Sequence, residues 1–143
     1  MYILNIEPKP QSRPRFNTRG GFVQTYEDKE MTAWKKDVRY MFNKGTWYTK
    51  DELFFDGETV KFDVTFYVNA PKYLQTKKNA DALENETLPV PKKPDIDNYV
   101  KALLDSLNGL AFSDDGQVAE IHAVKRYSLK PRIEFEMTEI KSQ

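Results

Sequence analysis

Hydrophobic and polar residues follow two different periods along this chain, and each period predicts a different element. Between Glu58 and Asn69 every second residue is apolar, which predicts a strand with one buried face. Apolar residues spaced three and four apart instead predict helices over about 28–43 and from 95 or 96 to 108. Gly45 and Gly109 follow these two helices and supply C-terminal stop signals.

Three other segments have the composition of strands. Tyr2–Ile6 is rich in β-formers, and residues 118–127 and 132–140 read as two more strands. We expect the last two to form a hairpin around Leu129–Pro131. The order β-α-β-α-β-β predicts an α+β fold with a mixed β-sheet and two main helices, in a single domain over 1–143.

Two polar stretches separate these elements. Residues 12–23 contain Gly20-Gly21, a pair that could close a hairpin or leave a mobile loop. Residues 71–94 are polar and contain several prolines, which predicts an extended, exposed connection. A loop of that length in a compact domain is often functional.

Composition excludes several kinds of chemistry. The chain has no Cys and a single His, so a thiolate nucleophile, a Cys-ligated zinc or a His-rich metal cluster is excluded. A metal site must then consist largely of oxygen ligands, which suits Mg²⁺ or Mn²⁺. No apolar run approaches the ~18 residues of a membrane span, and the N-terminus does not resemble a signal peptide. We therefore expect a soluble, cytoplasmic protein with no membrane partner.

The net charge is zero, but the charges are unevenly distributed. Residues 9–50 hold ten Lys or Arg and four Asp or Glu, whereas residues 51–143 hold twelve basic and seventeen acidic residues. A basic N-terminal part beside an acidic remainder fits phosphate contacts joined to a carboxylate metal site. Ordinary solvated surface is the alternative, and composition alone favours it.

Acidic residues flank the second predicted helix. Asp95 and Asp97 lie at its entrance, and Asp114 and Asp115 lie in the loop after its exit. Carboxylates packed together repel one another, and a divalent cation relieves that repulsion. Mg²⁺ retains several waters, one of which can attack a phosphodiester. Convergence of the two groups is a hypothesis, because a helix of ~14 residues is ~21 Å long.

Lys101 lies four residues after Asp97, on the same face of the helix, where it could neutralise a phosphate oxygen or position the water. Simpler explanations exist for these residues. Asp is a favoured N-cap, Asp-Asp-Gly is an ordinary turn sequence, and Asp97 with Lys101 has the spacing of a routine surface ion pair. Glu120 reads as an exposed strand residue rather than an extra ligand, and His122 as a strand residue with a hydrogen-bond partner rather than a base.

Two blocks resemble the RusA family of Holliday-junction resolvases, which are common in phages. They are Lys-Pro-Asp-Ile-Asp-Asn-Tyr-Val-Lys-Ala-Leu-Leu-Asp-Ser-Leu and Phe-Ser-Asp-Asp-Gly-Gln-Val, followed by a strand bearing Lys125. The similarity is strong over about 92–125 and looser over 9–16. It implies a homodimer that makes paired, symmetric cuts in a four-way DNA junction, in DNA recombination and repair.

The resemblance also implies roles for individual residues. Asp95, Asp97 and Asp115 match the metal-binding acids, Lys101 matches the catalytic lysine, and Asp114 matches a companion acid. Which acid of the Asp114-Asp115 pair is the closer metal ligand stays open.

Basic residues suggest where DNA would bind. Arg13, Arg15 and Arg19 share a loop with two Phe residues, which indicates either an arm that touches DNA or a solubilising loop anchored to the core. Further candidates for DNA contact are Lys72, Lys77, Lys78 and Lys125.

We interpret the sequence as a Mg²⁺-dependent, structure-selective endodeoxyribonuclease that resolves four-way junctions, with Mn²⁺ as a substitute ion. Two alternatives stay open: a metal nuclease acting on other branched DNA or on RNA, and a non-catalytic nucleic-acid-binding module whose acids only cap a helix.

Overall fold

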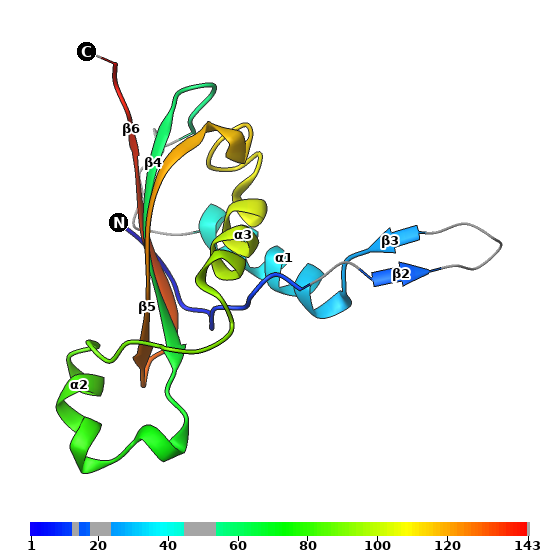
Figure 1. Cartoon of the computed structure of the whole chain (residues 1–143). Helices are drawn as coiled ribbons and strands as arrows, with labels where there is room; N and C mark the ends of the chain where they lie inside the picture. The colour runs from blue at the N-terminus through cyan, green and yellow to red at the C-terminus, as the bar shows by residue number, and fades with distance from the viewer. Residues whose placement is uncertain (13–14, 18–23, 45–53, 143) are drawn as a thin grey trace.

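A four-stranded mixed sheet forms the centre of the protein. The computed structural model describes residues 1–12, 15–17, 24–44 and 54–142. The strands are β1 (Tyr2–Leu4), β4 (Val60–Asn69), β5 (Val118–Ser128) and β6 (Arg132–Glu139), in the spatial order β1-β6-β4-β5. β4 runs parallel to β5 and antiparallel to β6, and β1 is antiparallel to β6 (Figure 1). This mixed α+β architecture confirms the predicted fold class.

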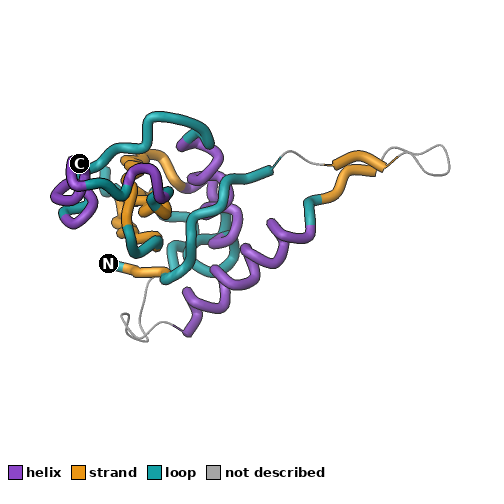
Figure 2. Tube along the Cα trace, turned by 90° about the horizontal axis from the view of Figure 1, so that it is seen from below, coloured by secondary structure: helices purple, strands orange, loops and turns teal. Residues whose placement is uncertain are grey.

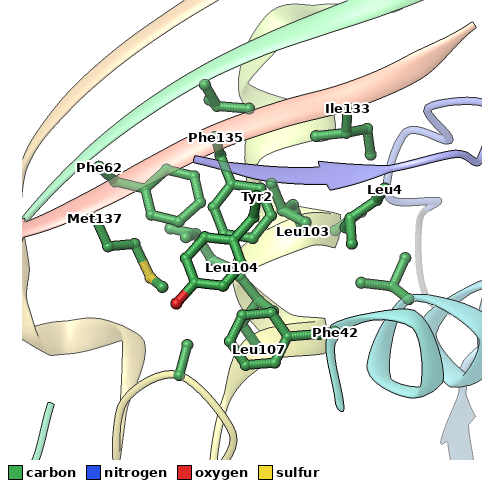
Figure 3. Close-up of a cluster of buried hydrophobic side chains, with 14 of the residues drawn as sticks. Tyr2, Leu4, Phe42, Phe62, Leu103, Leu104, Leu107, Ile133, Phe135 and Met137 are labelled. Atoms are coloured by element: carbon green, nitrogen blue, oxygen red, sulfur yellow. The ribbon is translucent and has the colours of Figure 1, made fainter. Parts of the chain in front are cut away.

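Two helices cover one face of the sheet and enclose the core. The apolar face of α1 (Lys29–Lys44) is buried, and α3 (Ile96–Leu107) packs against both α1 and the sheet. In Figure 3 the rings of Tyr2, Phe42, Phe62 and Phe135 are gathered beside the leucines of α3. The alternation in β4 is the reason: Val60, Phe62, Val64 and Phe66 are buried in the core, and Val68 is half-buried against it.

Helix boundaries follow local signals. The amides of Glu30 and Met31 donate hydrogen bonds to Asp28 Oδ1 over 2.7 and 3.2 Å, which caps α1. After α3 the chain turns at Gly109, whose φ of +80° is readily adopted only by a residue without a side chain. Both helices were predicted at these places. The expected stop at Gly45 lies outside the described residues.

The predicted hairpin between the last two strands is wrong. β5 and β6 are adjacent in the chain, but β4 lies between them and pairs with both. Three fully extended residues span ~10 Å, which is the width of two strand spacings of ~4.8 Å, so the short link allows this arrangement. The parallel β4–β5 pair needs a long crossover, and the segment that includes α3 supplies it.

The connection after β4 is more ordered than predicted. Residues 71–94 contain the short helices η2 (Lys72–Leu74), η3 (Lys77–Asn79) and α2 (Ala80–Glu84) rather than one extended, exposed segment. Leu83 and Val90 pack with Ala70 and Tyr127 in a second, smaller hydrophobic cluster. The apolar residues of this stretch are too sparse to show a period in the sequence, yet they converge on the end of β5.

A second, two-stranded sheet precedes α1. β2 (Arg15–Asn17) pairs antiparallel with β3 (Gln24–Tyr26). Both views show this pair beyond the beginning of α1 and away from the main sheet (Figures 1 and 2). Of the two alternatives for residues 12–23, strand pairing is therefore observed, although Gly20-Gly21 itself lies outside the described residues. Within the described ranges, no helix has the length and apolar character needed to span a bilayer.

Candidate active site

Asp95 stands at the entrance of α3 with its carboxylate free of the helix. It is the N-cap residue, with extended backbone angles of −67° and 145°, but its side chain accepts no capping hydrogen bond. Asp28 differs, because its carboxylate accepts hydrogen bonds from two backbone amides at the start of α1. The capping explanation for Asp95 therefore does not hold. Asp97, in the first turn of α3, is exposed as well.

The two carboxylates open onto a shallow hollow of about 610 Å³. Its polar lining consists of Asp95, Asp97, Lys92, Lys93 and Lys125, and its apolar lining of Val90, Pro91 and Ile96. The ammonium groups of Lys92 and Lys93 beside two carboxylates give a surface that can hold a phosphate close to acidic groups.

Asp114 has a structural task. The short helix η4 (Asp115–Gln117) follows α3, and Asp114 Oδ2 accepts a 2.9 Å hydrogen bond from the Gly116 amide. The Gln117 side chain in turn accepts a hydrogen bond from the Asp114 amide over 3.0 Å, which completes a reciprocal cap. A Cβ added at Gly116 would lie 2.7 Å from Asp114 Oδ2, so the glycine permits this contact. Asp114 therefore has the role that an Asp-Asp-Gly turn sequence usually has, which is to stabilise the turn.

Asp115 is in a different electrostatic position. Its half-buried carboxyl contacts the side chains of Asp105 and Asn108 at the end of α3. Burial raises the pKa of Asp115 above its ordinary value, and the negative charges of Asp114 and Asp105 raise the pKa further. A nearby cation would relieve this unfavourable charge. We regard Asp115 as the better ligand candidate of the pair.

Asp105 is a residue that sequence reasoning missed. It contacts Asp115, and its Oδ2 also lies 3.5 Å from the ammonium of Lys35 on α1. Lys35 also pairs with Glu27 over 2.7 Å, just before α1. An acid in the last turn of a helix faces the negative end of the helix dipole, and this unfavourable placement was the available signal.

The hypothesis that both acidic groups meet within one chain is not supported. Asp95 and Asp97 lie at the start of α3, whereas Asp115 contacts residues near its end. The eight residues from Asp97 to Asp105 span about 12 Å along the helix axis. Across the described residues, no group of three or more acidic or His side chains is close enough to hold a metal ion. The parallel β4–β5 register is the cause, because β5 starts at the far end of α3 from Asp95 (Figure 1).

Lys101 is exposed on α3, one turn after Asp97. Among the ion pairs of the described residues, none joins Asp97 to Lys101. The routine ion-pair explanation is therefore absent, and the ammonium is available to other groups.

The remaining candidates are spread over several surfaces. Lys72 lies in η2 beside Tyr73, whose hydroxyl accepts a 2.7 Å hydrogen bond from Lys92 of the hollow. Lys77 and Lys78 are exposed in η3, and Lys77 lines a separate cavity of about 720 Å³ next to α2. Lys125 points its ammonium at two backbone carbonyls, those of Lys92 and Pro94.

The other basic candidates belong to the arm. Arg15 is in β2, whereas Arg13 and Arg19 lie outside the described residues. On the main sheet, Glu120 is exposed, as predicted. His122 lies on β5, as predicted, with its Nδ1 3.5 Å from Asp63 Oδ1; the expected hydrogen bond stays a prediction.

Free carboxylates at a helix entrance, beside a row of lysines on an α+β scaffold, favour an enzyme that acts on phosphate esters. Comparison with known proteins gives the family: residues 5–138 match the model of endodeoxyribonuclease RusA. The chain belongs to the RusA family of endodeoxyribonucleases. This membership confirms the resemblance noted in the sequence and the predicted enzyme class.

Two curated relatives cover nearly the whole chain. The uncharacterized protein YqaN of Bacillus subtilis (strain 168) is 34% identical over 135 residues, which span 94% of this chain and 92% of that protein. The crossover junction endodeoxyribonuclease rusA of Lactococcus phage r1t is 27% identical over 143 residues, covering 97% of this chain and 95% of that protein.

Proposed function

We propose that this protein is a Mg²⁺-dependent endodeoxyribonuclease that resolves four-way DNA junctions by paired cuts. Family membership and the phage relative named for crossover junctions support the substrate. The observation that carries the proposal is the pair of carboxylates on Asp95 and Asp97. Asp95 is the N-cap of α3 but accepts no capping hydrogen bond, and Asp97 lies in the first turn. Both carboxylates line a hollow that also contains lysines.

The donor set fits a hard cation. Asp95, Asp97 and Asp115 offer only carboxylate oxygens, which Mg²⁺ prefers and Mn²⁺ also accepts. When bound, the ion supplies positive charge and an activated water for phosphodiester hydrolysis. The raised pKa of Asp115 indicates a carboxylate whose charged form would gain from such an ion.

A complete site requires a second copy of the chain. Mg²⁺ binds oxygens at 2.0–2.1 Å, so all its ligand atoms lie within roughly 4 Å of one another. The ~12 Å of helix between Asp97 and Asp105 exceeds that span. Asp115 of the partner subunit would therefore join Asp95 and Asp97, and a homodimer would contain two equivalent centres.

The outer edge of β5 is a suitable surface for this dimer. β5 is an edge strand of the sheet. Within the described chain, its outer edge is paired only near Arg126, which forms an isolated β-bridge with Pro89. Ile121 is 45% exposed in the open part. Antiparallel pairing of two β5 edges about a twofold axis near Ile121 brings the start of one strand toward the end of the other. Asp115 precedes that start, and Lys125 of the hollow lies near that end.

The chain's other residues would act on the substrate directly. Lys92 and Lys93 would hold phosphate groups of the junction in the hollow, and Lys101 would neutralise charge that develops on the phosphate in the transition state. Two centres related by a twofold axis would cut two strands symmetrically, so selectivity would come from junction shape and from the spacing of the centres.

A cleavage assay tests this function. Purified protein is incubated with a synthetic four-way junction, a linear DNA duplex or an RNA duplex, each with Mg²⁺ or with chelator. A three-way DNA junction is added as a second branched substrate. We expect paired nicks in the four-way junction only, and only with Mg²⁺. Binding to the junction without cutting would instead identify a nucleic-acid-binding module, and equal cutting of other branched DNA or of RNA would change the substrate.

A matched pair of variants identifies the acids. Asp97→Asn is expected to abolish cleavage while junction binding stays intact or becomes tighter, because the charge opposing the phosphates is lost. Asp81→Asn is the control, since Asp81 is an exposed acid in the first turn of α2, away from the hollow. It should cleave like the wild type. Loss of folding in Asp97→Asn, measured by circular dichroism, would assign that residue to the structure instead.

A further inference from the structure

The ammonium of Lys125 is turned toward the protein. Lys125 lies on β5 opposite Phe66 of β4, on the face of the sheet that the helices cover. Its Nζ donates hydrogen bonds of 3.0 Å to the Lys92 carbonyl and 2.9 Å to the Pro94 carbonyl. The side chain is half-buried and makes no ion pair with any described residue. Its charge is therefore stabilised by these carbonyl dipoles.

The two carbonyls belong to the segment that immediately precedes Asp95. Pro94 immediately precedes Asp95, the N-cap of α3. Further back, the Leu88 carbonyl accepts a 2.9 Å hydrogen bond from the Tyr127 amide, and Val90 is buried in the small cluster. β5 thus holds the segment at successive points, and Lys125 is the last of these before the carboxylates.

Lys125 provides hydrogen bonds at the entrance of α3, where the Asp95 side chain provides none to the helix. The Asp95 carboxylate does not cap the helix, so no side-chain hydrogen bond of that kind fixes the entrance of α3. The backbone of the preceding residues must then be fixed by other groups if the carboxylate is to stay in one position. Lys125 supplies two charge-assisted hydrogen bonds at that point, from β5 at the edge of the main sheet.

We propose that Lys125 is a positioning residue: its ammonium fixes the Lys92–Pro94 backbone and thereby presents the Asp95 and Asp97 carboxylates for metal binding. It does not act as a DNA-contact lysine. The cleavage measurements for this inference rest on the proposed nuclease function. The hydrogen-exchange measurement does not, because it depends only on the hydrogen bonds of Lys125.

Removing the ammonium distinguishes positioning from DNA contact. In Lys125→Met the Mg²⁺ concentration for half-maximal junction cleavage should rise by about 10- to 100-fold, the usual cost of losing a group that orients metal ligands. Junction affinity, measured by fluorescence anisotropy in chelator, should keep the wild-type dependence on salt. A phosphate contact would predict the reverse: an unchanged Mg²⁺ requirement and a salt slope smaller by about 0.9 for each lysine lost. That result would overturn the proposal.

Two further variants complete the test. Lys125→Gln keeps amide donors without the charge, so its Mg²⁺ requirement should fall between those of the wild type and the Met variant. It also serves in place of the Met variant if that variant does not fold. Lys93→Met removes an ammonium from the same hollow without removing a carbonyl contact. It should reduce the salt slope and leave the Mg²⁺ requirement unchanged, and a rise equal to that of Lys125→Met would contradict the proposed role.

Hydrogen exchange gives a readout without metal, DNA or activity. The Asn98 amide donates to the Asp95 carbonyl over 3.1 Å in the first turn of α3. Its exchange should become faster in Lys125→Met, while amides in the centre of β6 keep wild-type protection. Unchanged exchange at Asn98 would contradict positioning. If wild-type protein cuts no junction yet this local change appears, the proposed function fails and the positioning role stands.

Discussion

Mixing two inactive variants tests whether one catalytic centre draws its acids from two subunits. Asp97→Asn removes an acid at the start of α3, and Asp115→Asn removes one beyond its end. Each homodimer should be inactive, because each variant damages both of its centres. In the mixed dimer one centre carries both defects, and the other receives an intact Asp97 from one subunit and an intact Asp115 from its partner.

The size of the effect follows from this geometry. Along α3 the ~12 Å between Asp97 and Asp105 is about three times the ~4 Å that ligand oxygens around one Mg²⁺ can span. Random mixing of equal amounts makes half of the dimers mixed, and each mixed dimer holds one intact centre of two. The mixture should therefore show about a quarter of wild-type nicking activity, and purified mixed dimers about half.

The assay uses two differently tagged variants that are co-expressed and purified through both tags. Single-turnover nicking of a labelled four-way junction is measured with Mg²⁺, and each junction should receive one nick instead of two. A mixed dimer of Asp95→Asn and Asp97→Asn is the control, because both acids come from the same group and no intact centre forms. Complete inactivity of the Asp97→Asn and Asp115→Asn mixed dimer, with junction binding retained, would refute a shared centre.

Three other predictions concern single side chains. Lys101→Ala should slow single-turnover cleavage by about 10²- to 10³-fold and leave junction affinity nearly unchanged, because it removes charge stabilisation in the transition state; a wild-type rate would exclude it from the chemistry. Leu103→Ala should destabilise the protein by about 2–5 kcal/mol in urea unfolding, since Leu103 is fully buried in the core; a loss below about 1 kcal/mol would show that the core closes around the cavity. Glu86→Gln should cost about 1–3 kcal/mol at pH 7, because Arg132 donates to Glu86 over 2.6 and 2.8 Å and holds the pKa of that carboxyl below its ordinary value of 4.5. A lowered pKa contributes stability above pH 4.5 that is lost as the pH falls, so the difference between wild type and variant should shrink in acid; a constant difference from pH 7 to pH 3 would contradict this reasoning.

The hydrophobic pattern by itself determined the main elements. Alternation over Glu58–Asn69 and the apolar stripes of the two helices predicted β4, α1 and α3, because side-chain period is a local property of the chain. The candidate acidic residues were also visible in the sequence, because Asp95, Asp97, Asp114 and Asp115 flank the second predicted helix. Their role as metal ligands stays a prediction.

Tertiary structure decided how these elements combine. β4 inserts between β5 and β6, against the expected hairpin, because strand pairing joins residues that lie far apart in the sequence. The same parallel register places Asp115 at the opposite end of α3 from Asp95, so acids that are neighbours in the motif are separated within one subunit. Only folded contacts distinguish Asp114, which caps a turn, from Asp95, which stands at a cap position without capping. The direction of the Lys125 ammonium was equally invisible in the sequence, because hydrogen-bond partners are set by packing and not by residue type.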